Sequence, residues 1–431
     1  MRWVTGILAL TMAVPVEGQQ APPPQHLEVT LAEAIQRALE VQPLMVAARG
    51  EVRTSGAAMR ASSGAFLPSI TTGGSWGRRG GTTLNSTGQV VTFPTSNAYS
   101  GSISASIDLF TGFRRLADRR ASAATQDAAD AGLVNQRFRV TLDTRGFFYD
   151  ALATEELVRV AQSQVRRAQQ QLQISIDKLH AGSATRSDSL RSTVDFGNAR
   201  IALLEAQANL ATEQANLGRQ IGVDQPVRAV PDSVLPPLPD TTALRAIAVE
   251  RAPQVEQKDA QARAARARVV VSRQTYFPRI SYSAGTSTSN PEAPWENQTP
   301  YLKGWNVGIG ISWTLFNGFS RESGVVSASV ARDNAEADAA DTRRAVTAQL
   351  AQQIAALTTA YEKIDIARSN VAAATEDMRV QNERYRVGAA TILDLLTSQA
   401  SLTQAEQNFV QVRFDYLIAR AQLEALVGHE L

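Results

Sequence analysis

Two stretches of the chain alternate between apolar and polar residues. From Tyr99 to Leu109 the odd positions are Tyr, Gly, Ile, Ala, Ile and Leu, and the even positions are Ser or Asp. From Trp305 to Leu315 large apolar residues again take every second position, with Asn, Gly, Ser and Thr between them. A period of two predicts strands with one apolar face. The opposite face, built from small polar residues, suits contact with water.

A weaker pattern precedes each of these strands, at Ile70 to Trp76 and at Ile280 to Ser289. The sequence therefore predicts two hairpins, whose strands are joined by long polar loops at 77–98 and 290–304.

The spacing of aromatic residues indicates a membrane location. Trp305 and Trp313 are eight residues apart, or about 26 Å along a strand. The apolar band between the aromatic girdles of an outer-membrane barrel is roughly 25 Å tall. We expect a membrane β-barrel in which Tyr99, Trp305 and Trp313 form a lipid-facing girdle. The isoleucines at 103, 107, 309 and 311 would face lipid and Ser104 would face a wet lumen. An amphipathic sheet packed on a soluble core is the alternative.

Very long helices are predicted for much of the remaining chain. Proline is absent from Thr95 to Gln225 and from Tyr301 to Leu431, and Val325 to Val387 also lacks glycine. Such a run of 63 residues would extend roughly 95 Å as a helix, which indicates a coiled coil or a helical tube. A heptad supports this reading: apolar residues recur every seven positions at Leu395, Leu402, Phe409, Tyr416 and Leu423.

An internal duplication organises the chain. The segment around Gly182 matches the segment around Gly388, and the same offset of 206 residues relates the Leu-Phe-x-Gly-Phe sequences that begin at 109 and 315. A period of this length exceeds the 20 to 50 residues of solenoid repeats. Each half is therefore a complete structural unit. We assign residues 19–222 to the first repeat, 223–240 to a proline-rich extended linker, and 241–431 to the second repeat.

Helix lengths predict how each repeat is arranged. Ala34 to Ser62 and Thr185 to Gly222 together have 67 residues, close to the 70 of Gly112 to Ala181. Two short helices stacked end to end would thus lie beside one long helix. The chain would start and change repeats near the waist of a tube, and Thr30 with Glu33 would cap its first helix.

The first residues resemble a secretory signal. A positive Met1-Arg2-Trp3 precedes an apolar run from Val4 to Val14, and Val16-Glu17-Gly18 offers small residues for cleavage. We interpret residues 1–18 as a signal peptide. A membrane anchor, the alternative, requires about 20 apolar residues.

Composition narrows the function classes. The 43 basic and 41 acidic residues give a net charge of +2, and because the two signs are interspersed, no basic face for nucleic acid is evident. The chain contains zero cysteines and three histidines, His26, His180 and His429, which are far apart in sequence. No clustered acid, base or metal set stands out. We expect no catalytic site, no metal and no cofactor.

Four strands cannot form a membrane barrel alone. Free sheet edges would leave backbone amides and carbonyls unpaired in hydrocarbon, and the smallest such barrels have about 8 strands. We therefore expect the protomer to oligomerise in outer-membrane lipid, where a trimer would supply 12 strands.

The order and duplication of several motifs resemble those of the TolC family of outer-membrane efflux proteins. They are Thr30 to Ile35, Phe66-Leu67-Pro68, the Leu-Phe-x-Gly-Phe pair, and the turn Tyr385-x-x-Gly388-x-x-Thr391-x-x-Asp394. The resemblance implies a mixed fold of a trimeric membrane β-barrel and an α-helical barrel in the periplasm. It also implies a passive exit channel for small molecules or polypeptides. The channel would work with a periplasmic adaptor (membrane fusion) protein and an inner-membrane pump or ABC transporter, in a tripartite efflux pump or a type I secretion system.

The resemblance also suggests site residues. The helix tips at Gly182, Thr185, Gly388 and Thr391 would dock the adaptor, and Asp188, Tyr385 and Asp394 match the periplasmic aperture. Members of the family that close this end with charged residues carry them near 390 and 397. This chain has Ala390 and Thr397 there. A structural periplasmic coiled coil without channel activity is the competing hypothesis.

Overall fold

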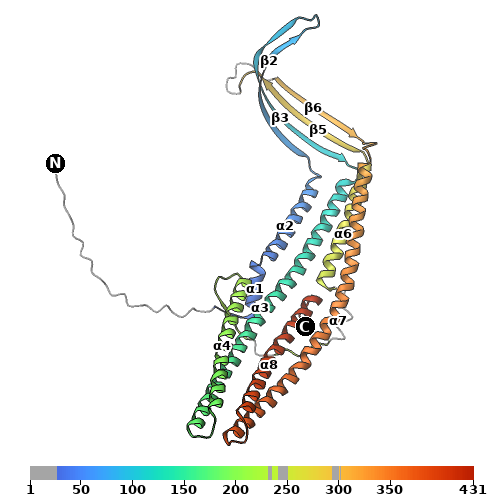
Figure 1. Cartoon of the computed structure of the whole chain (residues 1–431). Coiled ribbons are helices and arrows are strands. Elements are labelled where there is room, and N and C mark those ends of the chain that lie inside the picture. Colours follow the sequence, from blue (N-terminus) through green and yellow to red (C-terminus); the bar gives the residue numbers. More distant parts are fainter. Residues whose placement is uncertain (1–26, 232–234, 241–250, 294–299, 301) are drawn as a thin grey trace, which may run out of the picture.

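The structure, a computed structural model, describes residues 27–231, 235–240, 251–293, 300 and 302–431. A bent four-stranded sheet lies at one end of a long bundle of helices (Figure 1). The two halves of the chain contribute long and short helices and hairpins in the same order, as the duplication predicts. The predicted signal peptide lies outside the described residues.

The sheet consists of β2 (Ser69–Leu84), β3 (Val90–Phe110), β5 (Arg279–Asn290) and β6 (Leu302–Ser312), antiparallel and in that order. Its two faces differ as the alternation predicts. On one face hydroxyl groups bond across β2 and β3, with Thr71 Oγ1 at 2.7 Å from Ser104 Oγ. On the other face Ile103 and Ile309 are 55% and 68% exposed.

The predicted polar loop at 77–98 is wrong. β2 continues to Leu84 and β3 begins at Val90, so a short turn around Gly88 connects them. Backbone pairing continues past Arg78 and Thr82, opposite Asn97 and Thr92. Strand pairing depends on backbone groups and not on an apolar face, so a hairpin without a continuous apolar face gives no hydrophobic alternation to detect.

One end of the predicted strand at 305–315 also differs. β6 ends at Ser312, and Trp313 lies in the connection to the next helix, where its indole N–H donates to the Tyr276 carbonyl at 3.1 Å. The second predicted loop is bounded by Asn290 and Leu302, but 294–299 and 301 lie outside the described residues.

Helices α3 (Arg114–His180) and α7 (Ser320–Arg386) each have 67 residues, or about 100 Å. Near the sheet α2 (Pro43–Gly64) packs on α3, and α6 (Pro253–Arg273) with its 3-10 extension η1 (Gln274–Tyr276) lies between α3 and α7. Farther away α4 (Arg186–Ile221) packs on α3, and α8 (Ile392–Val427) on α3 and α7 (Figure 1). The predicted end-to-end stacking of short helices is confirmed. Within the described ranges, no helix combines the length and apolar character needed to cross a bilayer.

The first predicted helix, 34–62, is two helices. α1 (Leu31–Val41) and α2 are separated at Gln42, whose backbone is extended at ψ 129°. Pro43 causes the break, because the residue before a proline avoids the helical region. The capping box of Thr30 and Glu33 is present as predicted.

The apolar core lies at the waist of the helical part. There β1 (Leu27–Val29) pairs in parallel with β4 (Val227–Ala229), a contact the sequence analysis did not predict. The described residues of the linker contain no helix, and the Pro236 carbonyl accepts a hydrogen bond of 2.9 Å from Tyr416 Oη. Phe148, Leu217, Leu357, Tyr416 and Leu423 are among the buried side chains around this level. The waist thus joins the two repeats.

Candidate functional site at the helix tips

Both long helices end in the same turn at the end opposite the sheet. Gly182 and Gly388 have positive φ angles of 71° and 81°. In the first turn Ser183 N–H donates to Lys178 O at 2.8 Å, and in the second Ala389 N–H donates to Arg384 O at 2.7 Å. This is the Schellman arrangement, in which a left-handed residue closes a helix.

Open space surrounds both glycines. A Cβ atom added at Gly182 or Gly388 would meet no atom within 4 Å. Glycine is favoured at these positions by its backbone conformation alone. A side chain here would project into open space at the end of the molecule.

Each tip then starts the next helix with a capping box. Thr185 Oγ1 accepts from Asp188 N–H at 3.2 Å, while Asp188 Oδ2 accepts from Thr185 N–H at 3.0 Å. Thr391 and Asp394 repeat this geometry at 3.2 and 2.9 Å. The partner role of the aspartates in these caps was missed by the sequence analysis, although the Thr-x-x-Asp spacing in both tips could have indicated it.

The carboxylate of Asp394 is stabilised in its charged form. Hydrogen bonds from the Thr391 backbone N–H, and next from the Thr391 hydroxyl at 2.8 Å, lower the pKa of Asp394 from its ordinary value. Its local role is thus to hold the turn closed as an anion.

Tyr385 connects the two repeats just above the tips. Its side chain is 5% exposed, and its ring lies 4.3 Å from the Lys178 ammonium, which also donates to the Tyr385 carbonyl. The Tyr385 hydroxyl lies 3.4 Å from Ser175 Oγ, and Ser175 Oγ lies 2.8 Å from Ser192 Oγ. The structure therefore places Tyr385 against α3, and its described polar contacts are with Ser175 and Lys178 rather than with Asp188 or Asp394.

The sequence analysis missed Lys178, Ser175 and Ser192. The offset of 206 residues places Leu179 at the position equivalent to Tyr385, so the repeats differ at this point and the duplication gives no signal. An apolar cluster surrounds the contact: Tyr385, Ile392 and Leu395 are buried, with Ile174 and Ala390 packed against them. Ala390 thus contributes packing to this cluster.

Three ion pairs join α3 to α8 above this cluster. Arg167 pairs with Glu406 at 2.8 Å, Glu156 with Arg413 at 2.9 Å, and Arg145 with Glu424. Because these partners are more than 230 residues apart, they fix one helical pair of the protomer against the other.

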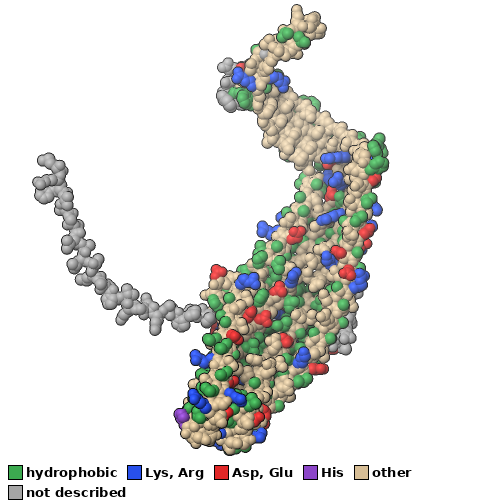
Figure 2. All heavy atoms as spheres, in the orientation of Figure 1, with side chains coloured by type: hydrophobic (Ala, Val, Ile, Leu, Met, Phe, Trp, Pro, Cys, Tyr) green, Lys and Arg blue, Asp and Glu red, His purple; other side chains and the backbone are tan. Residues whose placement is uncertain are grey.

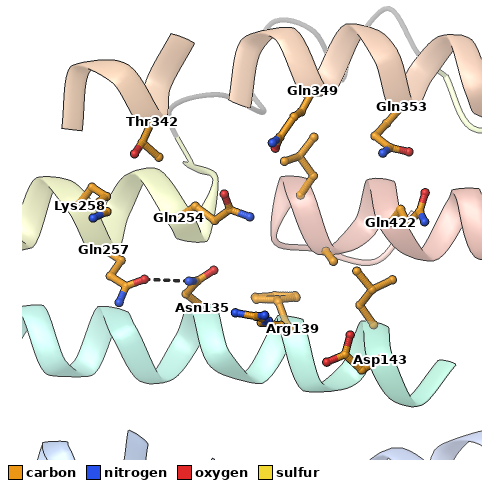
Figure 3. A pocket seen from close by; sticks show the side chains of 14 residues that line it. Asn135, Arg139, Asp143, Gln254, Gln257, Lys258, Thr342, Gln349, Gln353 and Gln422 are labelled. Atoms are coloured by element: carbon orange, nitrogen blue, oxygen red, sulfur yellow. Dashed lines mark hydrogen bonds between the residues drawn. The ribbon is translucent and has the colours of Figure 1, made fainter. Parts of the chain in front are cut away.

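The waist contains a cavity of about 610 Å³ where α6 and α8 meet end to end against α3 and α7 (Figure 3). Amides dominate its lining, and Asn135 Nδ2 donates to Gln257 Oε1 at 2.8 Å. Burial raises the pKa of the Asp143 carboxyl here, against the opposing effect of Arg139. The described lining offers hydrogen bonds but no arrangement of nucleophile and base, so the cavity reflects a junction of helix ends.

The described chain thus combines a four-stranded sheet that has an apolar outer face with a helical extension of about 100 Å that ends in two paired tips. These features define the protomer of an outer-membrane channel. Comparison with known proteins gives the particular family: the chain belongs to the outer membrane efflux protein family, whose model matches residues 34–223 and 244–429. It is a protein of the outer membrane with a helical periplasmic extension.

Relatives of known name are distant in sequence. The alkaline protease secretion protein AprF of Pseudomonas aeruginosa is 24% identical over 311 residues, which cover 70% of this chain and 64% of AprF. The chain therefore spans just under two thirds of that relative. The pyoverdine export outer membrane protein OpmQ of the same organism is 27% identical over 353 residues, covering 77% of this chain and 69% of OpmQ.

Solved structures share the fold. CusC has a TM-score of 0.78 at 17% identity, with 98% of this chain and 99% of CusC covered. The CmeC outer membrane channel of Campylobacter jejuni has a TM-score of 0.77 at 16% identity, with 92% and 85% covered. The mixed β-barrel and helical-barrel fold with an internal repeat is confirmed by these likenesses.

Proposed function

We propose that this chain forms a homotrimeric exit duct that carries solutes or polypeptides passively across the periplasm and the outer membrane. It performs no catalysis of its own. A periplasmic adaptor docks at the tips, and an inner-membrane pump or ABC transporter supplies the energy. The relatives named for protease secretion and pyoverdine export are consistent with a type I secretion system or a tripartite efflux pump.

One observation carries this proposal: the same two edges are open in every layer of the described protomer. The sheet ends in β2 and β6, the helices near the sheet run from α2 to α7, and the helices near the tips run from α4 to α7. A single rotation that joins β6 to the next copy's β2 also brings α7 to the next copy's α2 and α4. Such head-to-tail contacts close into a ring, and three copies supply 12 strands.

The α4 edge has the surface that such a contact needs. Four apolar residues spaced along one side of this helix are 55% to 65% exposed: Leu190, Val194, Ile201 and Leu204. On the opposite edge, Ile366 of α7 is 61% exposed. A neighbouring copy would remove these side chains from water.

The tips would then stand in a ring of six, about 100 Å from the membrane strands. Gly182, Thr185, Gly388 and Thr391 shape the docking turns. Tyr385, with Asp188 and Asp394 below it, belongs to the region where the tube narrows. A lumen lined by serine and glycine selects little, so the pump sets the cargo.

The duplication supplies a specific test of the trimer. Within the protomer Glu156 of α3 pairs with Arg413 of α8. The offset of 206 residues makes Glu362 of α7 equivalent to Glu156, and Gln207 of α4 equivalent to Arg413. In the ring, Glu362 would therefore face Gln207 of the next copy. The native chain has no cysteine. The double variant Glu362→Cys with Gln207→Cys should therefore cross-link in the membrane to a band of three chains.

Each single cysteine variant serves as the control and should give no ladder. A product that stops at two chains would contradict the ring. A chain that fractionates as a soluble protein and shows no heat-modifiable migration would instead favour the structural coiled coil.

A further inference from the structure

Positive charge gathers at one end of the sheet. Among the described residues of the four strands, the charged side chains are Arg78, Arg79, Asp108, Arg279 and Lys303. Asp108 and Arg279 neutralise each other near the helices through two bonds of 2.8 Å. Arg78, Arg79 and Lys303 are exposed at the far end, and no ion pair joins them to another described residue.

This charge is separated from the helices. Figure 2 shows Lys and Arg side chains where the β2 and β3 hairpin bends away from the rest of the sheet, and a largely uncharged surface between them and the helices. Glu292, two residues beyond β5, already has an interaction of its own.

Strand alternation places the three cations on different faces. Arg78 shares the apolar face with Trp76, and Lys303 shares it with Trp305 and Ile309. Arg79 lies on the opposite face with Ser75, whose hydroxyl is 2.7 Å from that of Ser100. Arg78 and Lys303 therefore point outward beside tryptophans, whereas Arg79 points toward the lumen.

The outward pair lies at or beyond the edge of the apolar band. Arg78 is opposite Asn97, ten residues from Ile107 on β3, which is about 33 Å along the strand and about 25 Å along the barrel axis at a tilt of roughly 40°. In the sheet register Ile107 pairs with Tyr282 and Tyr282 pairs with Ile309, so Ile309 marks the same level on β6. Lys303 is six residues from Ile309, or about 15 Å along the axis. With Ile309 near the bilayer midplane, the outer boundary of a roughly 25 Å hydrocarbon layer lies about 12 Å above this level, so Lys303 lies at that boundary and Arg78 lies beyond it among the headgroups.

We propose that Arg78 and Lys303 bind phosphate groups of anionic glycolipid headgroups in the outer leaflet of the outer membrane. Arginine binds phosphate through two parallel N–H donors and lysine as a point charge. Trp76 and Trp305 would lie beneath these cations, at the boundary between the headgroups and the acyl chains. The proposal rests on the membrane location and is independent of what the channel exports.

The test compares two kinds of variant in the purified trimer. Binding of diphosphorylated lipid A is measured by native mass spectrometry for the wild type, for Arg78→Gln with Lys303→Gln, and for Arg79→Gln as the matched inward control. The double variant should bind about thirty-fold more weakly, the effect of two charges at about 1 kcal/mol each. Arg79→Gln should bind like the wild type, and dephosphorylated lipid A should bind all three equally.

Two further measurements keep the result interpretable. Wild-type binding should weaken as salt rises from 50 to 500 mM, since exposed charges are screened, and the double variant should still conduct in planar bilayers. Equal losses in Arg79→Gln and in the double variant would overturn the proposal. Displacement of the lipid by inorganic phosphate at matched concentration would also overturn it, because the site would then accept free anions.

Discussion

Arg167 of α3 and Glu406 of α8 form a two-point ion pair across the seam between the repeats, with Nη1 to Oε1 at 3.1 Å and Nη2 to Oε2 at 2.8 Å. Their side chains are 20% and 23% exposed. Paired guanidinium and carboxylate groups with this geometry are specific in direction as well as in charge. The pair therefore fixes the register of α8 on α3.

Removing one partner should destabilise the helical part. Glu406→Gln leaves the Arg167 guanidinium half-buried without its anion, so we expect a loss of about 1 to 3 kcal/mol, between the values for exposed and buried pairs. Thermal unfolding of the trimer, followed by circular dichroism, measures this loss. Glu376→Gln, which breaks an exposed pair with Arg379 of 2.6 Å, is the control and should change stability by less than about 0.5 kcal/mol. Equal effects would show that the seam pair has no special role.

Tyr385 should hold the tips together mainly through its buried ring. Tyr385→Ala removes the contact with Lys178 and leaves a cavity, at a local cost of about 3 kcal/mol, and should raise the resting conductance in planar bilayers. Tyr385→Phe keeps the ring and loses only the contact with Ser175, at a cost of about 1 kcal/mol, and should conduct nearly as the wild type does. A leak in the phenylalanine variant as large as that in the alanine variant would assign closure to the hydroxyl instead.

The second tip should loosen in acid. The pKa of Asp394 is lowered in the folded protein by its bonds to Thr391, so its contribution to stability is present above the unfolded pKa of about 3.9 and is lost as pH falls through the folded value. The difference in thermal midpoint between wild type and Asp394→Asn should therefore be largest above pH 5 and should shrink below pH 4. If the difference in thermal midpoint is constant from pH 3 to 6, the charge of Asp394 is not the cause of that difference.

The two faces of the sheet should respond differently to charge. Ile309→Arg puts a cation on the proposed lipid face near the bilayer midplane and should cost about 2 to 4 kcal/mol, visible as a lower yield of heat-modifiable trimer. Ser104→Arg, on the face where Ser104 bonds to Thr71, should insert normally because the lumen is wet. The reverse ranking would mean that the faces are exchanged.

The tip glycines should be required for docking and not for assembly. Gly182→Val with Gly388→Val forces branched side chains into a left-handed backbone and into the open space of the tips, so export should stop while the trimer still inserts. Asparagine at the same positions tolerates this backbone conformation and separates backbone strain from side-chain bulk. Normal export by the valine variant would contradict adaptor docking at these turns. If the asparagine variant also fails to export while its trimer is intact, the bulk of the added side chain, and not backbone strain, is responsible for the loss of export.

The sequence by itself determined the element types, the duplication and the location of both tips. Periods of two and of seven, together with absent prolines, are local signals that survive without tertiary context, which is why α3, α7 and the duplicated tip turns were predicted closely. The two hairpins also followed, because each pairs strands that are neighbours in the chain, whereas the pairing of β3 with β5 did not.

Tertiary structure alone decided the remaining features. The pairing of β1 with β4, the contact of Tyr385 with Lys178, and the seam between Arg167 and Glu406 each join residues about 200 or more positions apart. No local pattern specifies such partners, since a half-buried arginine and a solvated one look alike in sequence. The extension of the β2 and β3 hairpin through residues 77–98 was missed for the related reason that backbone hydrogen bonds need no particular side chains. These features appear only when the folded helices and strands bring distant parts of the chain within bonding distance.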